Sequence, residues 1–293
     1  FAAGGADGVR NVELALKQIN NTIGGRRIET VVAPTDTRPD TTVRMARKLI
    51  EQDKVDIIIG PLSGSEGIAM RDFAKTIPGN VVINGISGAL ETTWVDPAPN
   101  FYRFNLDGAQ WGYGLGSYVV KQKNWRRVVT IAADYSFGYT NFMGFAVDYC
   151  KAGGDIAQRF WQPLGQSDFA AIIAQLPDDV DAIYLGLGGT DAINFLNQYQ
   201  QAGASVKLIG GTIMADQTVL TSKGKAKEAL KGTPTSGPFA ADNTDPAWTS
   251  YVKLYQTNIP EKDRFPSPSL FGLGYYVATQ AAIKGLQAAG GDL

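Results

Sequence analysis

The chain has no histidine and a single cysteine, Cys150, among its 293 residues. Without histidine, the commonest general base and the commonest neutral metal ligand are missing. One cysteine excludes a disulfide within the chain, and the two scarcities together exclude a Ser-His-Asp triad, a Cys-His dyad and a thiolate-rich zinc site. We therefore expect no enzyme, no metal and no cofactor, although an enzyme that works through carboxylates alone stays an alternative that turnover of a bound ligand would support.

Long apolar runs and an excess of one charge are also missing. No apolar run reaches the roughly 18 residues that span a bilayer. The 27 basic and 28 acidic residues leave a net charge of −1, which gives no electrostatic footprint for nucleic acid. The length suits two α/β lobes, at roughly 100–200 residues per domain.

Apolar runs alternate with amphipathic runs along almost the whole chain. The continuous apolar run VDIIIG is typical of a strand in a parallel sheet that is covered on both faces. Repeated strand–helix units predict an α/β fold of mostly parallel sheets with helices on both faces. The expected strands are 28–33, 55–60, 81–85, 126–133, 155–162, 180–188 and 206–211. The expected helices are 9–22, 41–52, 66–76, 111–122, 139–152, 169–176, 191–203, 246–256 and 270–289.

Small residues and hydroxyl groups fill the turns that follow several expected strands, as in GPLSGSEG after residue 59 and ISGALETT after residue 85. In open parallel sheets, ligands bind at the carboxyl ends of the strands. Free N–H groups and the positive dipole end of a helix favour an anion there. Ser63 and Ser65 therefore either cap the next helix or hold an acid.

Aromatic residues stand at two further turns, DGAQWGY (107–113) and DYSFGYT (134–140). Rings at the rim of a cleft sandwich a flat or apolar ligand, whereas rings at the edge of a lobe only pack. The residues alone leave both interpretations open.

Several motifs in order resemble one known family over essentially the whole chain. They are GADGVRNVELALKQIN, TDTRPDTTVRMARKLIEQDKVDIIIGPLSGS, DYSFGYTNFMGF and FLNQYQQAG. Together they resemble the type I periplasmic solute-binding proteins of branched-chain amino acid (Leu/Ile/Val) ABC transporters. The resemblance implies two lobes that are joined by a multi-strand hinge and close on a ligand. It implies lobe I at residues 1–106 plus 239–293 and lobe II at 107–238, and a chain that lacks the family's first strand and final segment.

The resemblance also implies a set of site residues. The family's two carboxylate-binding turns correspond to Ser63, Ser65, Ser87, Gly88 and Ala89. The apolar body of the ligand would meet Trp111, Tyr135, Phe137 and Tyr139, with Gly188 and Gly189 allowing close approach of the backbone.

The expected ligand follows from a departure from the family pattern. Amino-acid-binding members place an acid just after the strand that is here 206–211, where this chain has Thr212 and Ile213. A buried ammonium without a carboxylate partner is strongly disfavoured. We therefore expect an aromatic carboxylate of the benzoate or phenylpropenoate type, as in the organic-acid subgroup of the family. An amino-acid ligand stays an alternative, because the carboxylate of Asp107 can pair with an ammonium group.

The resemblance further implies partners and a location. We expect a monomer that delivers its ligand to the membrane subunits of an ABC permease. The expected location is periplasmic, after secretion through a signal peptide that this chain does not contain. A ligand-sensing domain of a receptor or regulator is the other alternative.

Overall fold

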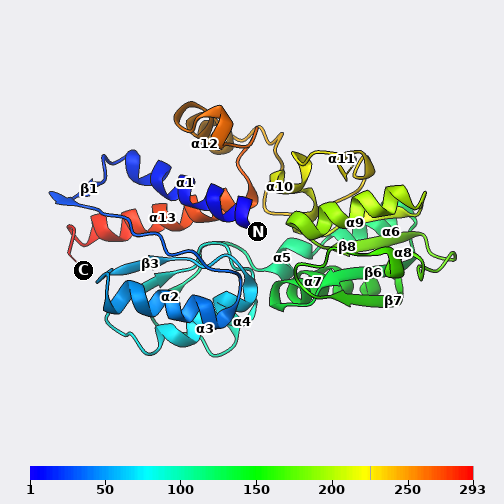
Figure 1. The fold of residues 1–293 in the computed structure, drawn as a ribbon, viewed down its shortest axis with the longest axis horizontal. Coiled ribbons are helices and arrows are strands. Elements are labelled where there is room, and N and C mark those ends of the chain that lie inside the picture. The colour runs from blue at the N-terminus through cyan, green and yellow to red at the C-terminus, as the bar shows by residue number, and fades with distance from the viewer. Residues whose placement is uncertain (225, 293) are drawn as a thin grey trace. The chain divides into compact units, whose positions relative to one another are not determined.

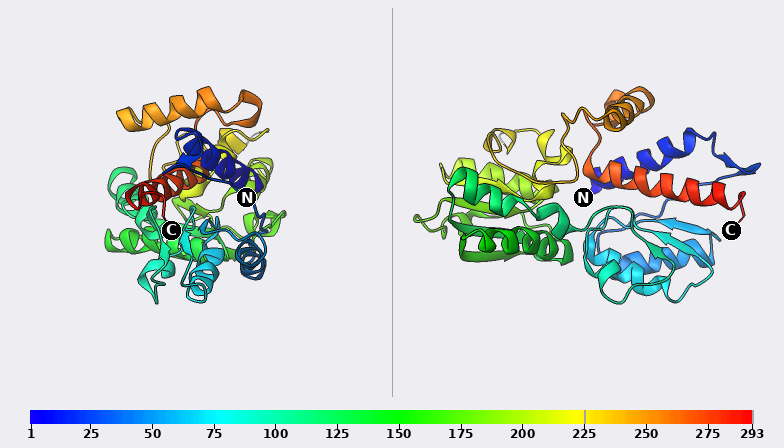
Figure 2. Two further views of the ribbon diagram at one scale, coloured as in Figure 1. Left: turned by 90° about the vertical axis from the view of Figure 1, so that its left-hand side faces the viewer. Right: turned by 180° about the vertical axis from the view of Figure 1, so that it is seen from behind.

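The computed structural model describes residues 1–224 and 226–292, and the chain divides into two compact units. Unit 1 holds Phe1 and residues 107–240; unit 2 holds residues 2–106 and the chain from Ala241 onward. Each unit has a parallel sheet with helices packed on it (Figures 1 and 2), which confirms the α/β fold. Within the described residues, no helix combines the length and apolarity needed to cross a bilayer.

Unit 1 is built on four parallel strands in the order β7-β6-β8-β9. They are β6 (Arg127–Ala133), β7 (Asp155–Gln162), β8 (Ala182–Gly186) and β9 (Lys207–Gly210). Every residue of β8 is buried, as expected for a central strand with helices on both faces. The helical segments are α5 (Gly108–Gly112), α6 (Leu115–Lys123), α7 (Ser136–Lys151), α8 (Ala170–Ile173), α9 (Gly189–Gln201), η1 (Thr212–Ala215), α10 (Gln217–Leu220) and α11 (Ala226–Ala229).

The core of unit 1 joins α6 and α7 to this sheet. Val119 and Val128 are completely buried in it. The ring of Phe145 stacks on Tyr149 at 5.1 Å and on Tyr184 at 4.4 Å between centroids. Aromatic pairs of this kind stabilise beyond their buried area, so α7 is firmly seated and its first turn is fixed at the carboxyl end of β6.

Unit 2 has a three-stranded parallel sheet, β3-β4-β5. Its strands are β3 (Ile57–Ile59), β4 (Val81–Ile83) and β5 (Phe101–Tyr102), with a separate hairpin of β1 (Thr22–Ile23) and β2 (Arg26–Arg27). Its helical segments are α1 (Ala2–Lys17), α2 (Pro39–Glu51), α3 (Gly64–Ala74), α4 (Glu91–Trp94), α12 (Pro246–Asn258), η2 (Glu261–Asp263) and α13 (Leu270–Ala288). Figure 1 shows β3 between α13 and the α2–α3 pair, and Figures 1 and 2 show α1 and α13 side by side.

A buried polar network ties α1 to α12 and α13. The carboxylate of Asp7 is fully buried and accepts hydrogen bonds from the Ser269 hydroxyl at 2.5 Å and the Tyr255 hydroxyl at 2.7 Å. Burial raises the pKa of Asp7, although the bonds from Ser269 and Tyr255 act in the opposite direction. Asn11 accepts a further bond from Tyr251 at 2.7 Å. Segments that are about 240 residues apart in sequence are therefore joined by satisfied polar groups.

The helix expected over 111–122 is two helices, because Gly114 between them has a φ of 93°. Only glycine adopts this left-handed conformation without strain. The break lets α5 and α6 take different directions.

The strand expected over 28–33 is also absent, because residues 28–33 pair with none of the described strands. An apolar pattern makes a strand only where a neighbouring backbone offers hydrogen bonds. The first helix, expected over 9–22, runs from Ala2 to Lys17 instead.

Candidate functional site

The turn after β3 starts helix α3 through Ser63. The Ser63 hydroxyl accepts a hydrogen bond from the Glu66 N–H at 3.3 Å and donates one to the carbonyl of Thr37 at 3.3 Å. In return, the Glu66 carboxylate accepts the Ser63 N–H at 2.9 Å, which completes a capping box. Ser63 therefore acts as the helix cap, and its single hydroxyl proton is directed to Thr37.

Glu66 is the buried acid of this turn. Its second carboxylate oxygen accepts the Thr42 hydroxyl at 2.6 Å. Both oxygens are thus occupied within unit 2, one by Ser63 and one by Thr42. A carboxylate engaged in this way stabilises the helix start and is not directed at a ligand cation.

Ser87, in the turn after β4, is one of the buried residues whose hydroxyl has no hydrogen-bond partner among the described residues. Its side chain is completely buried. The hydroxyl lies against the first turn of α3, at Gly67, where a Cβ would overlap it. Its backbone carbonyl accepts bonds from Asn84 at 2.9 Å and Asn105 at 3.3 Å. A buried hydroxyl without a partner costs free energy, so an acceptor or donor from a ligand would relieve it.

The other predicted residues of unit 2 flank this hydroxyl. Gly88 and Ala89 are buried and follow Ser87 directly. Ser65 is half-buried in the first turn of α3. The structure therefore brings the residues after β3 and β4 together, at the carboxyl ends of two neighbouring parallel strands.

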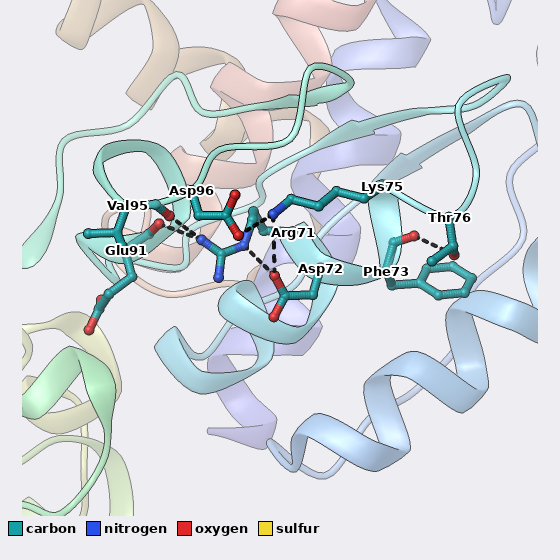
Figure 3. Close-up of polar contacts among 8 residues, drawn as sticks. All are labelled: Arg71, Asp72, Phe73, Lys75, Thr76, Glu91, Val95 and Asp96. Atoms are coloured by element: carbon teal, nitrogen blue, oxygen red, sulfur yellow. Dashed lines mark hydrogen bonds and ion pairs between the residues drawn. The ribbon is translucent and has the colours of Figure 1, made fainter.

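Arg71 of α3 holds the segment of Glu91 and Val95, which follows the turn after β4 (Figure 3). Its guanidinium donates to the carbonyl of Glu91 at 2.8 Å and to the carbonyl of Val95, and it pairs with Asp72 at 2.7 Å. The Arg71 side chain is only 8% exposed. Bonds from a charged, buried donor are among the stronger ones, so the position of the turn after β4 is coupled to α3.

Asp107 begins unit 1 as the N-cap of α5. It is fully buried, its Oδ1 accepts the Gln110 N–H at 2.9 Å, and its own N–H donates to the Gln110 side chain at 3.0 Å. This capping box fixes α5, which carries Trp111.

Four aromatic rings of unit 1 form a row, which we call the aromatic row: Phe1, Tyr135, Phe137 and Trp111. Successive centroids lie 6.2, 6.0 and 5.9 Å apart. Tyr135, Phe137 and Trp111 are each at least nine-tenths buried. The Trp111 indole N–H has no hydrogen-bond partner among the described residues. Burial and the nearby Asp191 raise the pKa of Tyr135, so its hydroxyl stays protonated at neutral pH.

Tyr139 lies apart from the aromatic row. It is 46% exposed, its ring packs edge-on against Trp161 at 4.8 Å, and its hydroxyl donates to Asp134. That hydrogen bond is the main cause of a raised pKa for Tyr139. Of the four predicted rings, the structure thus brings together three.

Gly188, Gly189 and Ile213 meet at the carboxyl ends of β8 and β9. A Cβ at Gly188 would overlap the side chain of Ile213. Buried Asn141 of α7 holds this corner, because its amide bonds to Gly108, Tyr184 and Thr212.

Reasoning from the sequence missed two groups in these regions. Asp191 lies in the first turn of α9, half-buried, with its pKa raised by burial, and it accepts the Gly165 N–H at 2.9 Å. Tyr275 of α13 lies against Gly85 and Gly8 in unit 2. The sequence could have indicated Asp191, because this acid directly follows GLGGT. It gives no such indication for Tyr275, which lies inside a long apolar helix.

The family model for the periplasmic binding protein matches residues 1–293. This chain belongs to the periplasmic binding protein family. A Leu/Ile/Val-binding protein homologue of Brucella melitensis is 21% identical, over 99% of this chain and 74% of the relative. The family and fold are those of solute-binding proteins of transport systems rather than those of enzymes.

Two solved structures show the fold of this family member. A solute-binding protein from Rhodopseudomonas palustris, in complex with 3,4-dihydroxy benzoic acid, has a TM-score of 0.88 at 24% identity, over 99% of this chain and 78% of that one. A leucine-binding protein from Thermotoga maritima has a TM-score of 0.82 at 21% identity, over 99% and 80%.

Proposed function

We propose that this chain is the extracytoplasmic solute-binding component of an ABC importer and that it captures a small carboxylate, with an aromatic acid of the benzoate type favoured. The observation that carries the proposal is the buried, unpartnered hydroxyl of Ser87 beside the first turn of α3. A carboxylate oxygen would accept that hydroxyl and would be stabilised by the positive end of the α3 dipole.

The aromatic preference rests on unit 1. The aromatic row places four rings in succession, and its Trp111 N–H lacks a partner among the described residues. Aromatic ligands gain from edge and stacked contacts with such rings. The Rhodopseudomonas relative, which holds a dihydroxybenzoic acid, supports this ligand class by analogy.

The buried acids argue against an ammonium ligand. Asp107 and Glu66 each form one side of a capping box. The position after β9 holds Thr212 and Ile213. An α-amino group would therefore meet no acid at the place where the family's amino-acid binders have one.

An amino-acid ligand is the second candidate, and Asp191 is the observation that favours it. This carboxylate stands in the first turn of α9, close enough to Tyr135 to raise its pKa. An ammonium at Asp191 would be a strong, charge-assisted partner. The Thermotoga relative, a leucine-binding protein, fits this candidate.

A thermal-shift panel separates the two candidates. Benzoate, 4-hydroxybenzoate and cinnamate are compared with leucine, valine and glutamate, each at increasing concentration, because a ligand that binds only the native state raises the melting temperature. We expect the aromatic acids to raise the melting temperature and the amino acids to leave it unchanged. A shift with leucine that Asp191→Asn abolishes would overturn the aromatic assignment.

A further inference from the structure

Tyr275 stands in α13, outside every turn that the sequence marks as a ligand site. Its ring lies beside three glycines of unit 2, namely Gly8 of α1 and the two glycines, Gly60 and Gly85, that follow β3 and β4. A Cβ would come within 2.8 Å of the ring at Gly8 and within 2.6 Å at Gly85. Its hydroxyl oxygen lies 3.7 Å from where a Cβ would stand at Gly60. The glycines therefore leave a slot that fits this ring.

The slot directs the end of the ring toward the Ser87 turn. Gly60 follows β3 and Gly85 follows β4, and the Gly60 N–H donates to Ile83 at 2.9 Å. Gly85 precedes Ser87 by two residues. Ring and serine thus lie at the same edge of the three-stranded sheet, although they come from segments nearly 190 residues apart.

The Tyr275 hydroxyl is available as a donor. It forms no hydrogen bond within the described part of the chain, whereas the neighbouring Tyr276 hydroxyl accepts a bond from Gln18 at 3.0 Å. Burial and the charge of Glu66 raise the pKa of Tyr275, so the group stays protonated. Glu66, whose charge acts on this phenol, already accepts hydrogen bonds from Ser63 and Thr42.

We infer that Tyr275 is a ligand-binding residue, whose hydroxyl donates to the same carboxylate that Ser87 binds. The inference rests on the proposed carboxylate function. It adds a neutral hydroxyl donor from α13 to the serine hydroxyls of the turns after β3 and β4. Neutral donors suit this edge, because buried Glu66 would form an ion pair with any cationic side chain placed there.

The test is isothermal titration of benzoate into wild-type protein, Tyr275→Phe and Tyr276→Phe, with the melting temperature of each ligand-free protein. The two variants remove the same atom from adjacent residues of one helix. We expect Tyr275→Phe to weaken benzoate binding about tenfold, since a hydrogen bond to a charged group is lost. Its ligand-free melting temperature should equal that of the wild type, because the hydroxyl has no partner in the folded chain. Tyr276→Phe should bind as the wild type does.

Three outcomes overturn the inference, and they are distinguishable. Wild-type affinity in Tyr275→Phe, with benzoate still bound, removes Tyr275 from the site and leaves the proposed function standing. A lower ligand-free melting temperature with unchanged affinity makes the residue structural. Wild-type protein that binds no carboxylate of the panel refutes the proposed function itself, and the inference falls with it.

Discussion

Replacing Ser65 and Ser87 together by alanine is expected to weaken benzoate binding at least about 100-fold. Each hydroxyl that bonds a charged acceptor contributes roughly 1.5–3 kcal/mol, so two of them amount to two decades or more in Kd. The Ser87 replacement itself should not destabilise the protein. Removing the unpartnered Ser87 hydroxyl takes a buried, unsatisfied group out of the core, which leaves the free energy of unfolding unchanged or higher.

Two controls make that result specific. Ser117→Ala combined with Ser250→Ala changes two serines outside the proposed site and should bind as the wild type does. Ser63→Ala removes the cap of α3 and should lower the free energy of unfolding by about 1 kcal/mol. Titration calorimetry and urea unfolding measure both quantities. Unchanged benzoate affinity in the Ser65/Ser87 variant would refute the assignment of the carboxylate to these turns.

Replacing Asn141 by leucine is expected to cost about 3 kcal/mol or more of stability. The amide donates to the Gly108 carbonyl at 2.8 Å and to the Thr212 hydroxyl at 2.9 Å. It accepts from the Tyr184 hydroxyl at 3.0 Å and from the Thr212 N–H at 3.2 Å. Leucine would leave these groups buried without partners, at roughly 1–3 kcal/mol for each that finds no water.

Asn258→Leu on α12 is the matched control. That amide is exposed and bonds only within its own helix region, to Leu254 and Thr257, so its loss should change stability by about 0.5 kcal/mol or less. Urea denaturation of both variants, followed by tryptophan fluorescence, gives the comparison. Equal stability of Asn141→Leu and wild type would show that the corner of Gly108, Tyr184 and Thr212 does not depend on this amide.

Much of the fold could be predicted from pattern alone. The apolar run before Gly60 and the run over 180–188 contain β3 and β8, because a parallel sheet covered on both faces leaves a continuous apolar signal. Residues 28–33 carry a similar pattern but remain outside the sheets, since pairing depends on a neighbour that sequence pattern does not show. The Gly114 break was hidden because a helical periodicity runs through it.

The candidate site was predictable only where polar or aromatic side chains lie close to the end of a predicted strand. Ser87 and Trp111 were predicted in this way and stay predictions as ligand-binding residues; the structure adds that both carry buried polar atoms without partners among the described residues. Ser63 was ambiguous in sequence, because a cap and a ligand contact use the same residue types. Tyr275 could not be found, since only the tertiary packing of α13 over Gly8 and Gly85 brings it to the strand ends.

The central claim is that this family member recognises a carboxylate, and one comparison tests it most directly. Benzoate and benzamide have nearly the same shape and differ in charge and in one donor group, so calorimetric titration of each into the wild-type protein at neutral pH isolates recognition of the anion. We expect saturable benzoate binding and benzamide binding that is at least about 100-fold weaker, because hydroxyl donors and the α3 dipole act on the charge. Equal affinity for the two compounds, or benzamide binding tighter than benzoate, would contradict it.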